Sequence, residues 1–166
     1  DEEGGTVQRV FDNYPSARTY GEAEDYEKLE KDYAEKSKKL LEMGINMNLA
    51  PVADVSGEGS FMKDRSFSSD YTIAGKFVEK AVKAMKSEGI ITSLKHFPGY
   101  ANAEDTHKGA YTDTRAMEEV QKDIDIFKKG INAGAPTIMT SHITVDAIDP
   151  DNPASLSKKV INKIRG

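Results

Sequence analysis

The chain has 166 residues, of which 37% are hydrophobic and 31% are charged, a composition typical of a folded globular domain. Its formal net charge of −5 argues against a nucleic-acid partner, because binding to phosphates usually requires a basic surface. The absence of cysteine excludes thiol catalysis, thiolate metal sites and disulfides. No apolar run approaches the roughly 18 residues that a membrane-spanning helix needs, so we expect no membrane span.

Four segments carry apolar residues at the spacing of three or four that indicates an amphipathic helix. Glycines that suit the left-handed end of a helix follow the first three, at Gly44, Gly89 and Gly134. The four segments are residues 26–41, 74–85, 117–131 and 157–164.

A short apolar run follows each of these glycines, at residues 45–50, 90–94 and 137–140. Runs that lack polar alternation are typical of strands buried on both faces of a parallel sheet. The alternating order of helices and strands therefore predicts an α/β fold, built of repeated βα units around a mainly parallel sheet.

Polar side chains gather where these predicted strands end. Asp54 and Arg65 come after the first strand, Lys95 and His96 follow the second, and His142 follows the third. Ligands of parallel α/β proteins bind at the carboxyl ends of the strands, so this placement predicts a binding site there. Taken singly, Lys95 also fits a solvated charge and His96 a buried histidine of the core.

The long polar loop after His96 ends in an Asp-x-His pair, Asp105 and His107. An extended backbone would direct both side chains to the same side. A carboxylate can then fix the tautomer of the imidazole and stabilise its charged form, as general acid/base catalysis requires. Loops also contain such pairs by chance, so the pair alone does not establish a function.

Several motifs together resemble the N-terminal barrel domain of family 3 glycoside hydrolases. The combination of Lys-His-Phe-Pro-Gly with a downstream Asp-x-His is similar to the β-N-acetylglucosaminidase branch of that family. The motifs occur in the family's order: Asp-x-Glu-Gly-Gly-x-Val-x-Arg at 1–9, Pro-Val-x-Asp-Val at 51–55, Arg-Ser-Phe-Ser at 65–68, Lys-His-Phe-Pro-Gly at 95–99 and Asp-x-His at 105–107.

The resemblance implies a retaining hydrolase that removes terminal β-linked N-acetylglucosamine from glycans or peptidoglycan fragments. His107 would be the general acid/base, held by Asp105 in a dyad. The nucleophilic aspartate would lie on a later strand, beyond the helix that starts at Ser157. The resemblance also implies the residues that bind or surround the terminal sugar: Asp1, Arg9, Arg65, Lys95, His96 and His142.

The same resemblance implies that residues 1–166 are the central portion of one family 3 catalytic barrel domain, part of a (β/α)8 TIM barrel. The first strands and the nucleophile strand would lie outside these residues, and a complete barrel typically has ~250 residues. The sequence departs from the family at Tyr100-Ala101, where Gly-His-Gly is common and this chain has Gly-Tyr-Ala. That change affects the loop before the dyad.

Two other interpretations remain open at this point. A non-catalytic glycan-binding or regulatory domain could keep the family's pocket without its chemistry, and the missing nucleophile favours it. A metal-dependent hydrolase could use His96, Asp105, His107 and His142, although no His-x-His or His-x-x-x-His spacing is present. We expect a carbohydrate partner, no cofactor and no metal.

Overall fold

Three parallel strands form the main sheet of the computed structural model, which describes residues 1–100, 105–106 and 108–165. The strand order is β1-β2-β4, with β2 in the middle, and both pairings are parallel. The α/β fold with a parallel sheet is thereby confirmed. The strands are β1 (Met47–Asn48), β2 (Ile91–Phe97) and β4 (Thr137–Thr140).

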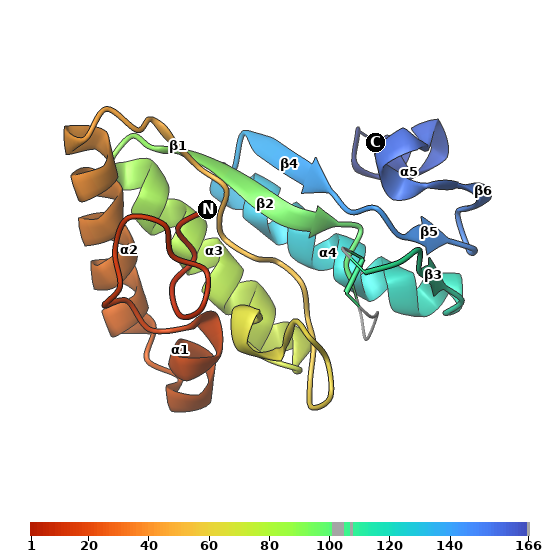
Figure 1. Cartoon of the computed structure of the whole chain (residues 1–166), viewed down its shortest axis with the longest axis horizontal. Helices are drawn as coiled ribbons and strands as arrows, with labels where there is room; N and C mark the ends of the chain where they lie inside the picture. Colours follow the sequence, from red (N-terminus) through yellow and green to blue (C-terminus); the bar gives the residue numbers. More distant parts are fainter. Residues whose placement is uncertain (101–104, 107, 166) are drawn as a thin grey trace.

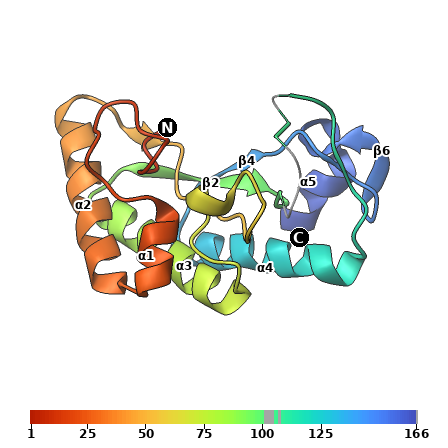
Figure 2. The same cartoon turned by 60° about the horizontal axis from the view of Figure 1, so that its bottom comes forward.

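Helices precede each strand of this sheet, and α3 and α4 lie against one face of it (Figure 1). The turned view shows the N-terminal segment on the opposite side of the sheet from these helices (Figure 2). The helices are α1 (Ala17–Ala23), α2 (Tyr26–Glu42), α3 (Tyr71–Ser87), α4 (Met117–Ala133) and α5 (Lys158–Arg165), with short 3-10 turns at Lys63–Arg65 and Ala154–Leu156.

The predicted helices are confirmed, and their ends have local causes. Asp70 caps α3 by accepting hydrogen bonds from the backbone amides of Thr72 and Ile73, which have no partner inside the helix. Gly134 ends α4 with a φ of +110°, a left-handed conformation that costs a glycine little. Apolar side chains of α3 such as Phe77 then face the core.

The structure corrects two details of the predicted sheet. Lys95 and His96 lie inside β2 rather than after it, because pairing with β4 extends the strand to Phe97. All four residues of β4 are only partly buried, so the prediction of a strand buried on both faces is wrong for β4. In the described part of the chain β4 is an edge strand of the sheet, which leaves it more accessible.

A second, small sheet was not apparent from the sequence. β3 pairs with β5 in parallel, and β5 pairs with β6 in antiparallel fashion. Two of these strands have two residues each, too few to show a period of two, and β6 reads Asp-Pro-Asp-Asn-Pro, a composition typical of turns. The strands are β3 (Thr112–Asp113), β5 (Thr144–Val145) and β6 (Asp149–Pro153).

Helix α1 also escaped prediction, and it touches the segment that carries Arg65. A Cβ added to Gly21 of α1 would lie 1.7 Å from the backbone carbonyl oxygen of Phe67. The glycine therefore permits a close approach between α1 and the 65–68 segment, which places Arg65 beside the sheet.

Gly21→Ala should test this contact. Alanine in a helix normally stabilises relative to glycine by about 1 kcal/mol, but here its methyl group would overlap a backbone atom that cannot rotate away. We expect the free energy of unfolding, measured in urea, to fall by roughly 1–3 kcal/mol. Gly75→Ala in α3 is the control, because its nearest neighbours are side-chain atoms of Lys129 that can move. A gain in stability at Gly21 would contradict the contact.

Candidate active site

A cavity of about 480 Å³ opens beside the carboxyl ends of β2 and β4. All six residues that the resemblance assigned to the substrate line it, although they come from five separate stretches of the chain. Those six are Asp1, Arg9, Arg65, Lys95, His96 and His142. The remaining lining residues are Val7, Phe61, Tyr100, Met139 and Thr140.

The ammonium group of Lys95 lies at the centre of the charged contacts. Its side chain is 2% exposed, and its Nζ lies 2.6 Å from Asp1 Oδ1 and 2.7 Å from Glu3 Oε1. Burial lowers the pKa of Lys95, while the charge of Glu3 acts in the opposite direction. A buried ammonium needs such partners, because an unpaired charge in the interior is costly.

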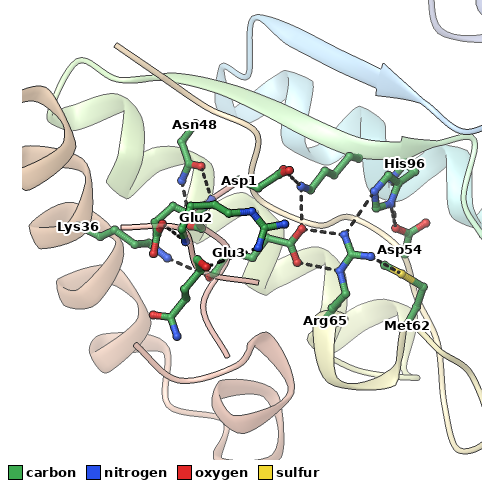
Figure 3. Close-up of polar contacts among 12 residues, drawn as sticks. Asp1, Glu2, Glu3, Lys36, Asn48, Asp54, Met62, Arg65 and His96 are labelled. Carbon is green, nitrogen blue, oxygen red and sulfur yellow. Dashed lines mark hydrogen bonds and ion pairs between the residues drawn. The ribbon is translucent and has the colours of Figure 1, made fainter. Parts of the chain in front are cut away.

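Glu3, which our sequence analysis did not select, is the carboxylate shared by Lys95 and Arg65. Its two oxygens accept hydrogen bonds from Arg65 Nε at 2.9 Å and Nη2 at 2.8 Å, a two-point contact that fixes the guanidinium plane (Figure 3). Burial alone would raise the pKa of Glu3, but the hydrogen bonds and charges of Arg65 and Lys95 hold it below its ordinary value. Two carboxylates two residues apart, as in Asp-x-Glu, were the signal that could have identified it.

The backbone of Glu2 ties this acidic segment to β1. Its amide donates to Asn48 Oδ1 at 2.9 Å, and Asn48 Nδ2 donates back to its carbonyl at 3.0 Å. The carboxylate of Glu2 turns the other way and accepts from the amides of Arg9 and Val10. Glu2 therefore fastens the segment to the surrounding fold, whereas Asp1 and Glu3 on either side of it pair with Lys95 at the cavity.

Lys36 of α2 supports the same segment from the helix side. Its Nζ donates to the backbone carbonyl of Glu3 at 2.9 Å and lies 4.3 Å from the centre of the Tyr33 ring. Burial lowers the pKa of Lys36 to about 8.

Gly4, the residue after Glu3, has a φ of +113°, and a Cβ added to it would lie 2.2 Å from the carbonyl oxygen of Pro15. The turn after Glu3 therefore requires glycine.

Asp54 fixes His96 from beneath the pocket. Its Oδ2 accepts from the His96 amide at 3.1 Å and faces ring Nδ1 at 2.8 Å. A carboxylate can only accept, so Nδ1 carries the proton and Nε2 faces Arg65 Nη2 at 3.5 Å. Asp54 therefore supports the His96 ring, in a geometry that is visible in Figure 3.

The turn after β2 is supported on its outer side by α4. Gly99 has a φ of +122°, and an added Cβ would lie 2.8 Å from the Asp123 side chain. Asp123 is paired with Arg115 Nη2 at 2.5 Å. Burial raises the pKa of Asp123 to about 6, while the charge of Arg115 opposes that rise. This glycine allows the Lys-His-Phe-Pro-Gly segment to pass directly over α4.

Arg9 and His142 lie at the rim of the cavity. Arg9 is exposed, and its Nη1 donates weakly to the carbonyl of Gln8 at 3.5 Å. His142 is also exposed, and its Nδ1 lies 3.1 Å from Ser155 Oγ. Both side chains remain accessible to a bound molecule.

The predicted dyad is only partly within the described residues. Asp105 lies 3.8 Å from Lys108 Nζ through its Oδ2 and borders a small separate hollow with residues 108–111. His107 lies outside the described residues, so the pairing of Asp105 with His107 stays a prediction. Within the described residues no group of three or more His, Cys, Asp or Glu side chains could hold a metal ion.

Residues 1–165 match the model of the glycosyl hydrolase family 3 N-terminal domain. The chain belongs to glycosyl hydrolase family 3. It is 32% identical over 176 residues to a beta-hexosaminidase of Hydrogenovibrio crunogenus, a match that covers 99% of this chain and 49% of that protein. This family 3 chain therefore spans about half the length of the curated relatives it matches.

Solved structures agree with the family assignment. The β-N-acetylhexosaminidase of Beutenbergia cavernae superposes with a TM-score of 0.88 at 30% identity, covering 99% of this chain and 52% of that chain. A family 3 β-N-acetylglucosaminidase of a Paenibacillus species superposes with a TM-score of 0.93 at 29% identity, covering 99% and 33%. No described helix is long and apolar enough to cross a membrane.

Glu3→Gln should show how strongly the site depends on the shared carboxylate. Glutamine keeps the shape but leaves Arg65 without its carboxylate partner and Lys95 with Asp1 alone, so the free energy of unfolding at pH 7 should fall by about 3 kcal/mol. Because the pKa of folded Glu3 lies below 4.5, its contribution is complete above pH 4.5 and is lost as the pH falls through the folded-state pKa. The difference in the free energy of unfolding between the parent protein and Glu3→Gln should become smaller only in that acidic range.

Urea unfolding across pH measures this difference. Glu35→Gln is the matched control, because Glu35 pairs with Lys39 on the exposed surface of α2, where an ion pair contributes little. A deficit of Glu3→Gln that does not change between pH 7 and strong acid would contradict an electrostatic origin.

Proposed function

We propose that the protein to which this chain belongs is a retaining glycoside hydrolase that removes terminal β-linked N-acetylglucosamine from glycans or peptidoglycan fragments. One observation carries the proposal: the six residues that family resemblance assigns to the sugar line one cavity at the carboxyl ends of parallel strands. Relatives called beta-hexosaminidase match the full length of the chain and support the same activity.

The cavity offers the donors and acceptors that sugar hydroxyls require. Asp1 is 36% exposed at its side chain, whereas Glu3 is 4% exposed, so Asp1 presents the accessible carboxylate and Glu3 the buried counter-ion. Lys95 and Arg65 donate from directions that these carboxylates fix. We infer that Asp1 accepts from a sugar hydroxyl while Lys95 donates to the same part of the ring.

Aromatic side chains supply the apolar part of the cavity wall. Phe61 and Tyr100 both line it, with their ring centres 5.4 Å apart at an interplanar angle of 81°. Sugar rings have apolar C–H faces beside polar hydroxyl rims, so a wall of this mixed character suits them better than it suits a phosphate or a fully apolar ligand.

The chemistry that we assign follows the two-step retaining route. An aspartate on a later strand, outside residues 1–166, attacks the anomeric carbon while His107 gives its proton to the leaving glycosidic oxygen. The imidazole of His107 then takes a proton from a water molecule, whose oxygen attacks the same carbon and releases the aspartate. Asp105 stabilises the charged imidazole in this proposal.

Hydrolysis of a chromogenic β-N-acetylglucosaminide by the full-length protein, compared with the matching β-glucoside, tests this proposal. We expect preferential release from the N-acetyl substrate, and His107→Ala should lower kcat/KM by about 10²–10⁴-fold, the usual contribution of a general acid/base. Asp105→Asn should also lower it. Asp125→Asn, an exposed carboxylate on α4, is the matched control and should leave it unchanged.

The other outcomes discriminate between the alternatives. Binding of N-acetylglucosamine without release from either substrate would overturn the hydrolase and favour a glycan-binding domain. Activity lost on addition of a chelator and restored by a divalent metal would instead favour metal-dependent hydrolysis.

A further inference from the structure

Tyr100 forms part of the cavity wall directly after the Pro98-Gly99 turn. Its side chain is almost fully buried, with a residue exposure of 4%. The ring meets the imidazole of His96 edge to face, with centres 4.9 Å apart, and meets Phe61 in the same manner. The ring is therefore fixed between a predicted sugar-binding histidine and an aromatic side chain of the opposite loop.

The backbone of Tyr100 is held by the carboxylate that holds His96. Asp54 Oδ1 accepts from the Tyr100 amide at 2.7 Å, while Oδ2 serves His96. The Asp54 side chain is fully buried, so both contacts lie in an environment that strengthens them. One carboxylate thus places both ends of the turn relative to the pocket.

The hydroxyl of Tyr100 reaches forward to the following loop. It lies 2.8 Å from Oγ1 of Thr106, a hydrogen-bonding distance between two side chains six residues apart. Thr106 stands between Asp105 and His107 in the sequence. A contact at Thr106 therefore constrains where the backbone of Asp105 and Thr106 can lie.

We propose that Tyr100 is a positioning residue for the acid/base pair. Through its bond to Thr106, the phenol ties the residue next to Asp105 to the wall that presents His96, an inference that rests on the proposed glycosidase activity. Tyr100 would act through Thr106 and without touching the glycosidic bond. Proton transfer depends steeply on the placement of the acid, so loss of this bond should act on kcat more than on KM.

A set of conservative substitutions in the full-length protein tests the inference. Tyr100→Phe removes only the hydroxyl and Thr106→Val replaces its partner by a methyl group, and each should lower kcat on the chromogenic β-N-acetylglucosaminide by about tenfold, with KM changed less than about twofold. The double variant should lose no more than about the same tenfold, because both changes remove one interaction. Thr106→Ser keeps the hydroxyl and should restore most of the rate.

The control is Tyr26→Phe, the same chemical change in α2, where the ring stacks on Phe77 at 4.3 Å on the helix side of the sheet. It should leave kcat unchanged. Thermal unfolding of every variant establishes that the rates are measured well below its melting temperature, so a loss that merely tracks the unfolded fraction would count against positioning.

Each remaining outcome is decisive. The positioning role would be overturned if kcat of Tyr100→Phe equalled that of the active parent protein, or if the losses in kcat of the two single variants multiplied in the double variant. Either result would leave the proposed activity intact. Absence of turnover by the parent protein would overturn the proposed activity and this inference with it.

Discussion

The ammonium group of Lys95 is buried at the end of the central strand, and the arrangement of the site depends on how that charge is neutralised. A buried cation requires carboxylates within reach, and these come from Asp1 and Glu3 at the N-terminal end of the described chain. The N-terminal segment must therefore lie along the carboxyl end of β2. Because Glu3 also holds Arg65, the same requirement places the Arg65 side chain at the cavity.

Residues of the surrounding helices and strands support this network of charged side chains. Lys36 from α2 donates to the Glu3 carbonyl, and Asn48 of β1 pairs with the backbone of Glu2. Asp54 performs the equivalent task for His96 and Tyr100. The side chains of Lys95, Arg65 and His96 thus have little freedom to reorient, which is the preorganisation that selective binding of a polar ligand requires.

Helices α2 to α5 and the three strands of the main sheet could be predicted from the sequence because their causes are local. Apolar residues at spacings of three and four fix which face of α3 or α4 is buried, and Gly134 supplies a backbone conformation that other residues adopt at a cost. Five of the six cavity residues were found by their position in motifs and His142 by its position after a predicted strand, and the fold brings them together. The extent of the complete barrel domain and the pairing of Asp105 with His107 stay predictions.

The sequence by itself therefore determined the α/β class, the family and the ends of strands where the site lies. Only the tertiary structure decided which charges pair, since Asp1 and Lys95 are 94 positions apart and Arg65 and Glu3 are 62 apart. The same holds for Tyr100, whose contact with Thr106 depends on the turn that Asp54 and Asp123 support from two sides. The spacing of residues along the chain determines helices and strands, because these form between residues that are close in sequence. Ion pairs between distant residues depend instead on which side chains the packing of the fold brings together and removes from water.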